Sequence, residues 1–145
     1  MTYQQIPNVS VWQLGQQYVE AAEILLDYNR IQPAAVLAAL ANEIFIKSFL
    51  ATRHATGHAT TQREHSIVTL YERITPELQA KLLACSSEIN AKVDFLAEMK
   101  KHDGIFVSAR YRYEPTSPNS LGSDIVYFAR HLCESVHLLG KKRSN

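Results

Sequence analysis

Cysteine is scarce in this sequence: Cys85 and Cys133 are the only two in 145 residues, and they do not form a Cys-x-x-Cys pair. Isolated cysteines inside helical patterns are typical of reduced packing residues, not of a disulfide framework. Long apolar runs are also missing, because no stretch reaches the ~20 residues that a membrane span requires. The N-terminus has no basic region followed by an apolar run. We therefore expect a soluble, cytoplasmic protein without membrane contact.

An excess of one charge is absent as well. Lys and Arg number 15 against 14 Asp and Glu, so net charge argues neither for nor against a nucleic-acid partner. The chain has no strand-like alternation of any length and no internal repeat. A chain of 145 residues can bury enough surface to fold without a disulfide or a metal. These absences favour one domain over residues 1–145 with an all-α fold, an antiparallel bundle of five to six helices.

The most apolar part of the chain is residues 33–50, which are apolar nearly all the way round a helix. Such a pattern predicts a buried central helix. Three polar residues interrupt it: Asn42, Glu43 and Lys47. Glu43 and Lys47 lie four residues apart and can pair along one helix face. The group therefore either forms a buried structural network or lines a polar groove that binds a ligand.

Periodicity and capping patterns predict the other helices. Ser10 with Gln13, and Thr61 with Glu64, are capping boxes that indicate two helix starts. Apolar residues then recur at three- and four-residue spacing along each helix. The predicted helices cover approximately residues 10–30, 33–50, 61–74, 76–86, 89–104 and 123–140, with loops near 53–60 and 105–122.

The last predicted helix carries a polar stripe. Arg130, Glu134, His137 and Lys141 recur at helical spacing opposite its apolar side. As a solvated face, the stripe holds an ordinary Arg130–Glu134 surface pair and an exposed imidazole. As a site, Arg130 neutralises a phosphate and His137 moves protons in metal-independent RNA cleavage through the 2′-OH. The two residues lie about 10 Å apart along a helix axis, a separation that a symmetric dimer could bridge.

Two other patterns raise the question of a metal ion. Glu134 and His137 form one Glu-x-x-His half of a di-iron site, but the chain contains no second half. His54 and His58 have no cysteine or carboxylate ligand near them in the sequence and are typical of a solvated loop. We expect no metal and no cofactor.

A short basic and aromatic tract, residues 109–114, lies in the second predicted loop. Here Arg110 and Arg112 alternate with Tyr111 and Tyr113, a combination that holds phosphates while stacking bases. The alternative is that the tyrosines fold onto the bundle while the arginines pair with neighbouring carboxylates.

Three patterns, taken in order, resemble the HEPN superfamily of nucleotide- and RNA-associated helical domains. The first is the alanine-rich stretch that ends in Glu-x-x-x-Lys at residues 35–47. The second is His-x-x-x-x-Leu at residues 65–70, and the third is Ala-Arg-Tyr at residues 109–111. The resemblance spans most of the chain.

The resemblance implies an α-helical bundle that dimerises. In active members an Arg-x(4–6)-His motif acts as a metal-independent endoribonuclease across the dimer interface, and Arg130 and His137 fit it at its longest spacing. Members with the Ala-Arg-Tyr element are nucleotide-binding partners of small nucleotidyltransferases, in toxin–antitoxin or defence systems.

Three functional hypotheses follow. The first is a cytoplasmic homodimer that binds nucleotide or RNA phosphate and works with a nucleotidyltransferase or antitoxin. The second is an endoribonuclease, and the third is a non-catalytic structural interaction domain. The predicted site residues are Arg130 and His137 for catalysis, and Arg110, Tyr111, Arg112, Glu43 and Lys47 for ligand binding.

Overall fold

The computed structural model describes residues 7–53, 59–60, 64–105 and 122–143. These residues form helices joined by short connections and one very short pair of strands, so the all-α prediction is confirmed. The helices are α1 (Val9–Asp27), α2 (Ile31–Lys47), α3 (Ile67–Glu72), α4 (Pro76–Ile89), α5 (Phe95–Lys101) and α7 (Asp124–Arg143), and the strands are β1 (Thr52–Arg53) and β2 (Ala59–Thr60).

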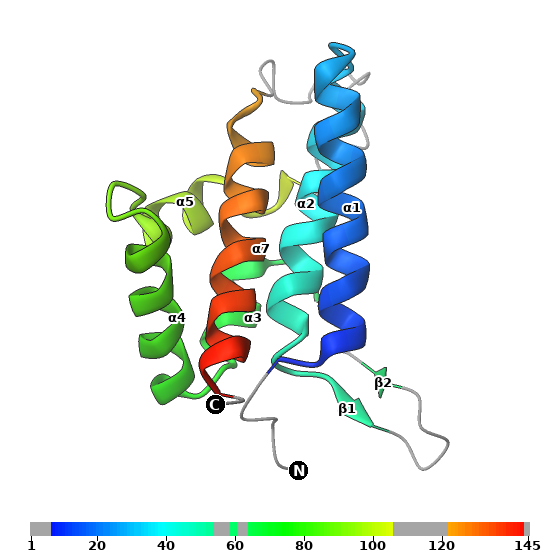
Figure 1. Ribbon diagram of the computed structural model, residues 1–145. Coiled ribbons are helices and arrows are strands. Elements are labelled where there is room, and N and C mark those ends of the chain that lie inside the picture. The colour runs from blue at the N-terminus through cyan, green and yellow to red at the C-terminus, as the bar shows by residue number, and fades with distance from the viewer. Residues whose placement is uncertain (1–6, 54–58, 61–63, 106–121, 144–145) are drawn as a thin grey trace.

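Three long helices form the middle of the fold. α1, α2 and α7 lie side by side, and α4 packs against α7 on the side away from α1 (Figure 1). The turn between α1 and α2 contains Asn29, which has a positive φ of 59°. Such a short connection makes the two helices antiparallel neighbours, as the sequence predicts.

α2 is the central helix, which confirms the prediction from its apolar sequence. It contacts α1, α3 and α7, and its residues Phe45 and Ile46 are fully buried. The approach of α1 to α2 depends on Gly15, because a Cβ atom there would lie 2.6 Å from Cε1 of Phe45. The closeness of α1 to the core is therefore set by a residue without a side chain.

Two helices do not start where their capping boxes predict: α1 starts earlier and α3 starts later. α1 begins one residue before Ser10, because Oδ1 of Asn8 accepts a hydrogen bond from the backbone N–H of Val11 at 3.1 Å. α3 begins at Ile67, where Oγ of Ser66 accepts from the backbone N–H of Thr69 at 3.2 Å. The predicted start at Ser10 is therefore wrong, and the helix predicted over residues 61–74 begins at Ile67, while Thr61 itself lies outside the described residues.

Other boundaries also differ from the prediction. The loop near 53–60 contains an antiparallel backbone pairing of Thr52 with Thr60 and of Arg53 with Ala59. α7 continues past Gly140 to Arg143, so the last helix is longer than expected. This extension places Lys141 on a regular helix.

Two buried histidines pack against the ring of Phe128. The ring centroids of His102 and His131 lie 5.6 Å and 6.3 Å from it. Nε2 of His131 is 2.7 Å from Oγ of Ser86, and Nε2 of His102 is 3.0 Å from Oε2 of Glu98. Burial lowers the pKa of both imidazoles below the usual value, although nearby carboxylates oppose the shift.

We expect the free energy of unfolding to fall when the pH is lowered from about 7.5 to about 5.5. Because the folded state lowers the pKa of His131, the unfolded chain binds the extra proton first. The stabilisation is therefore complete above the unfolded pKa and is lost as the pH falls towards the folded one. Urea denaturation at both pH values measures the fall, which should be smaller in a His131→Gln variant. For each protein, the fall is the free energy of unfolding at pH about 7.5 minus that at pH about 5.5. An equal fall in the variant and in the native protein would show that His131 does not cause the pH dependence.

Candidate functional site

Arg130 lies on the side of α7 that faces α1. Its Nε donates a hydrogen bond to Oε2 of Glu23 at 2.9 Å, and its Nη2 donates to Oε1 of the same carboxylate at 2.5 Å. Glu23 belongs to α1, so the contact joins the two helices. The ion-pair partner of Arg130 is therefore Glu23 and not the expected Glu134, because a neighbouring helix presents the carboxylate for two parallel bonds.

His137 lies further along α7, against an aromatic side chain of α1. Its ring stacks on the indole of Trp12, with centroids 5.1 Å apart and an angle of 28° between the planes. The indole Nε1 donates a hydrogen bond to the backbone carbonyl of Cys133 at 3.1 Å. This bond holds Trp12 against α7 and thereby fixes the ring that His137 contacts.

Arg130 and His137 line the same hollow between α1 and α7. Its volume is about 350 Å³, and Trp12, Glu134 and Lys141 also line it. The structure thus brings both predicted catalytic residues to one site within a single chain, although they stand two turns apart on α7. The remaining described residues of the wall are Gln16, Ile89, Cys133 and Leu138.

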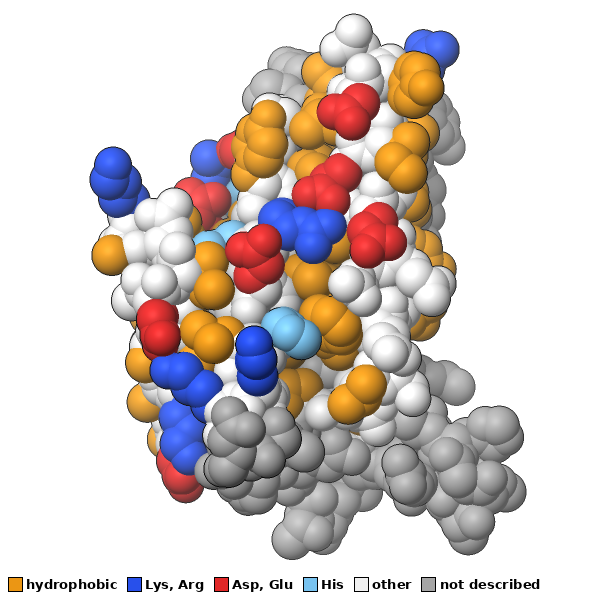
Figure 2. All heavy atoms as spheres, viewed as in Figure 1, with side chains coloured by type: hydrophobic (Ala, Val, Ile, Leu, Met, Phe, Trp, Pro, Cys, Tyr) orange, Lys and Arg blue, Asp and Glu red, His pale blue; other side chains and the backbone are white. Residues whose placement is uncertain are grey.

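Positively and negatively charged side chains both lie at this hollow. Glu23 raises the pKa of the Arg130 guanidinium above its usual range, so the arginine stays charged while its charge is largely compensated. Figure 2 shows this face with basic and acidic side chains interleaved over α1 and α7, and a histidine beside a hydrophobic side chain. Burial raises the pKa of the Cys133 thiol to about 11, which keeps it protonated and unreactive near neutral pH.

A second hollow adjoins the first. Its volume is about 450 Å³, and Trp12, His137 and Lys141 line both hollows. The other described residues of its wall are Pro7, Val9, Gln13, Val136 and Gly140. The stacked pair of Trp12 and His137 therefore stands between a hollow that also includes Arg130 and Glu134 and a hollow whose other walls are mostly apolar.

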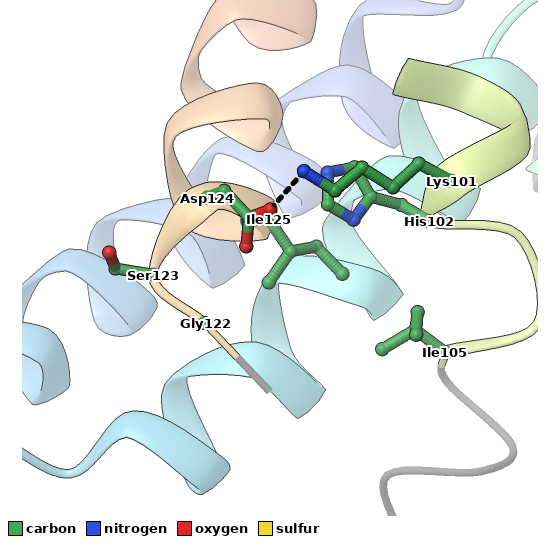
Figure 3. A pocket seen from close by; sticks show the side chains of 7 residues that line it. All are labelled: Lys101, His102, Ile105, Gly122, Ser123, Asp124 and Ile125. Atoms are coloured by element: carbon green, nitrogen blue, oxygen red, sulfur yellow. Dashed lines mark hydrogen bonds and ion pairs between the residues drawn. The ribbon is translucent and has the colours of Figure 1, made fainter. Parts of the chain in front are cut away.

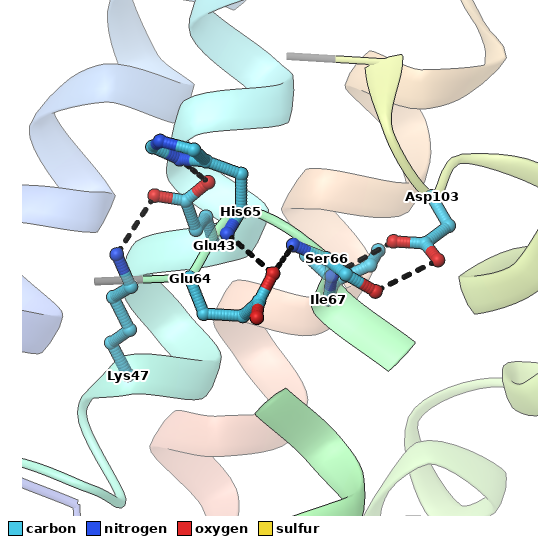
Figure 4. A network of polar contacts seen from close by, with 7 residues as sticks. All are labelled: Glu43, Lys47, Glu64, His65, Ser66, Ile67 and Asp103. Atoms are coloured by element: carbon cyan, nitrogen blue, oxygen red, sulfur yellow. Dashed lines mark hydrogen bonds and ion pairs between the residues drawn. The ribbon is translucent and has the colours of Figure 1, made fainter. Parts of the chain in front are cut away.

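Glu43 and Lys47, which the sequence analysis considers both for ligand binding and for a structural network, lie in a different place. Nζ of Lys47 is 3.0 Å from Oε2 of Glu43, and Nδ1 of His65 is 2.9 Å from its Oε1 (Figure 4). The side chains of Glu43 and Lys47 are only 4% and 11% exposed. Both oxygens of the buried carboxylate are thus engaged, as a structural network requires.

The same network ties the start of α3 to α2 and α5. His65 and Ser66 directly precede α3, and Asp103 follows α5. Oδ1 of Asp103 accepts from the backbone N–H of Ile67 at 2.9 Å, and Oδ2 accepts from Oγ of Ser66 at 3.0 Å (Figure 4). Two of the three HEPN-like patterns, at residues 35–47 and 65–70, therefore meet in space through the contact of His65 with Glu43.

The predicted phosphate-binding residues Arg110, Tyr111 and Arg112 lie outside the described residues. A hollow of about 510 Å³ is lined by residues on either side of this segment, among them Lys101 and Asp124 (Figure 3). These two side chains form an ion pair with an N···O distance of 2.5 Å. Lys101 is therefore engaged by a carboxylate in this hollow, as Arg130 is engaged by Glu23 at the α1–α7 face.

The sequence analysis missed Trp12 and Glu23. Trp12 is the only tryptophan of the chain, and that rarity is the one signal that could have drawn attention to it. Glu23 has no such signal, because it is one of several acids on α1 and lies 107 positions from Arg130. The described residues contain no group of three or more His, Cys, Asp or Glu side chains that could hold a metal ion.

Comparison with known proteins adds no further assignment. Within the described part of the chain, no helix combines the length and the apolar character needed to cross a bilayer. The chain matches no protein-family model, no curated protein and no solved structure. The resemblance to HEPN domains therefore stays a prediction.

Proposed function

We propose that this protein is a HEPN-like helical domain that binds single-stranded RNA, or a nucleotide, by its phosphate at the α1–α7 face. The observation that carries the proposal is that Arg130, His137 and Lys141 line one hollow beside the indole of Trp12. Basic groups next to an aromatic ring are the combination that binds a sugar-phosphate backbone and its bases.

Glu23 has a defined part in this binding. Its carboxylate occupies the guanidinium of Arg130 through two bonds, and a phosphate can accept the same two bonds. Both side chains are partly exposed, at 31% for Arg130 and 38% for Glu23, so an exchange does not require the core to open. A bound phosphate therefore competes with Glu23 for Arg130 and first contacts Lys141, which is exposed at the end of α7.

Replacement of Lys141 by glutamine is expected to weaken RNA binding and reduce its salt dependence. Each phosphate contact to a single strand contributes a slope of about −0.7 in a plot of log affinity against log salt concentration, so the slope should decrease by about that amount. Fluorescence anisotropy of a labelled single-stranded oligoribonucleotide, titrated in EDTA at several salt concentrations, measures both quantities.

The matched control is Lys100→Gln, which removes the same charge from an exposed position on α5. It should leave the slope unchanged because α5 is not part of the α1–α7 hollow. Absence of binding of both the oligoribonucleotide and a mononucleotide by the native protein would overturn the proposed function. An equal loss in both variants would show that binding follows net charge and not this site.

A second candidate function is metal-independent RNA cleavage, and it is favoured by the presence of Arg130 and His137 in one hollow. In this reaction the 2′-oxygen attacks the adjacent phosphorus while the bond to the 5′-oxygen breaks. His137 takes the proton from the 2′-hydroxyl and a proton is returned to the departing 5′-oxygen. Arg130 stabilises the negative charge that develops on the phosphoryl oxygens. The products carry 2′,3′-cyclic phosphate and 5′-hydroxyl ends.

The proposal also includes assembly as a cytoplasmic homodimer and cooperation with a nucleotidyltransferase or antitoxin partner, as the HEPN resemblance implies. Support comes from large apolar side chains that α1 and its following turn expose. Leu14 is 46%, Ile24 is 59% and Tyr28 is 74% exposed. An exposed apolar face of this kind is typical of an interaction surface.

A further inference from the structure

The C-terminal half of α1 and the N-terminal half of α7 expose large side chains on one face. Ile24 of α1 and Tyr28, directly after α1, are 59% and 74% exposed, and Tyr127 of α7 is 66% exposed. Tyr127 lies one turn before Arg130, which contacts Glu23 of α1, so it belongs to the side of α7 that meets α1. Exposed side chains of this size on adjoining helices are typical of a surface that another molecule covers.

The charged side chains of α1 beside this face are all acidic. α1 contains Glu20, Glu23 and Asp27 and no basic residue. Glu23 is engaged by Arg130, whereas Glu20 and Asp27 are exposed and form no ion pair with any residue that the structure describes. Figure 2 shows acidic side chains spread along α1 with hydrophobic ones beside them. The face therefore combines apolar groups with unpaired negative charge.

The position of Asp27 is unfavourable for the fold by itself. Asp27 lies in the last turn of α1, at the negative end of the helix dipole, and this turn has no basic residue. Arg30, the next cation along the chain, forms no ion pair with a described residue. A cationic partner would compensate both the carboxylate and the helix end. Exposed tyrosine rings also attract the charged groups of lysine and arginine through their faces.

We propose that this face docks a basic amphipathic helix of a partner protein. The apolar side of that helix covers Ile24, Tyr28 and Tyr127, and its lysine or arginine side chains pair with Glu20 and Asp27. A second copy of the chain fits less well, because an isologous contact would bring the same acidic row close to itself. The inference rests on the protein-partner part of the proposed function and deepens it, since it gives the charge and the shape of that partner.

Binding of a labelled synthetic peptide, followed by fluorescence anisotropy without RNA, tests the inference. The probe is an amphipathic helix with leucine on one face and lysine on the other. The comparison peptides are a scrambled sequence of the same composition and a version with glutamate in place of lysine. We expect both to bind about ten-fold more weakly than the lysine helix, which the formal net charge of +1 does not itself attract. Equal binding of all three peptides, or no binding of the lysine helix, would overturn the inference, whereas the RNA titration decides the proposed function independently.

Variants then locate the binding on the protein. Glu20→Gln combined with Asp27→Asn should weaken binding of the lysine helix about ten-fold and reduce its salt dependence, and Ile24→Ser should weaken it about five-fold. The matched controls are Glu72→Gln, at an exposed position of α3, and Leu96→Ser, at a 43% exposed position of α5, and both should leave the affinity unchanged. Equal losses in variants and controls would contradict this site. Weaker self-association of Ile24→Ser with unchanged peptide affinity would assign the face to a second copy and also overturn the inference.

Discussion

On the endoribonuclease hypothesis, the purified native protein is expected to cut single-stranded RNA in EDTA, and a His137→Ala variant is expected to cut it about 10²–10⁴-fold more slowly. The physical reason is that imidazole is the side chain that most often acts as general acid or base, and His137 is the histidine that lines the hollow. Arg130 lines the same hollow and can stabilise the phosphoryl oxygens, but it cannot replace a proton carrier. Fragment analysis of a defined oligoribonucleotide measures the rates and identifies the new ends.

The controls separate catalysis from binding and from folding. His137→Ala removes a ring that stacks on Trp12, so near-ultraviolet circular dichroism and thermal unfolding must show that the variant stays folded. Glu23→Gln keeps the shape of the side chain but removes the charge that pairs with Arg130, and it should raise both RNA affinity and cleavage rate. If native protein leaves the RNA intact, the endoribonuclease hypothesis is wrong. Cleavage that persists undiminished in His137→Ala would instead exclude His137 as the proton carrier.

Replacement of Lys47 by methionine is expected to lower the free energy of unfolding by about 3–5 kcal/mol. The variant leaves the carboxylate of Glu43 buried without its ammonium partner, with only His65 still in contact. Desolvation of an uncompensated charge costs far more than the loss of an exposed ion pair. Urea denaturation monitored by circular dichroism gives the difference between variant and native protein.

The chain contains a matched control on α4. Lys81 and Glu77 form an ion pair with the same four-residue spacing, but their side chains are 38% and 66% exposed. Lys81→Met should therefore cost only a few tenths of a kcal/mol. The double variant Glu43→Leu with Lys47→Met should recover much of the lost stability, because it removes both buried charges. Equal effects of Lys47→Met and Lys81→Met would contradict a structural role for the buried pair.

The buried pair and the surface pair could not be distinguished from the sequence. Glu43 with Lys47 and Glu77 with Lys81 have the same spacing on helices, and spacing predicts only that the members of each pair can meet. Burial depends on which neighbouring elements cover the helix face, and His65, which contacts Glu43, lies 22 positions away. The sequence analysis accordingly left open whether Glu43 and Lys47 bind a ligand or stabilise the fold.

Helix starts show the same limit at short range. The sequence contains several side chains that can cap α1, and Ser10 within a capping box is the stronger pattern. In the structure Asn8 takes that role, and its backbone N–H also donates to the carbonyl of Ser48 at 2.8 Å. That contact with the end of α2 holds Asn8 at the helix start. A tertiary hydrogen bond thus selects between two caps that are locally comparable.

The helical class, the buried central helix and the polar stripe of the last helix can all be predicted from the sequence. All three follow from local periodicity, since residues three and four positions apart share a helix face whatever the rest of the chain does. The contacts of that stripe, by contrast, depend on how the helices pack. Glu23 and Trp12 lie 107 and 121 positions from the α7 residues with which they form hydrogen bonds. Contacts across such separations exist only after α1 has packed against α7, and for that reason the two hollows and the charge balance around Arg130 could not be read from the pattern alone.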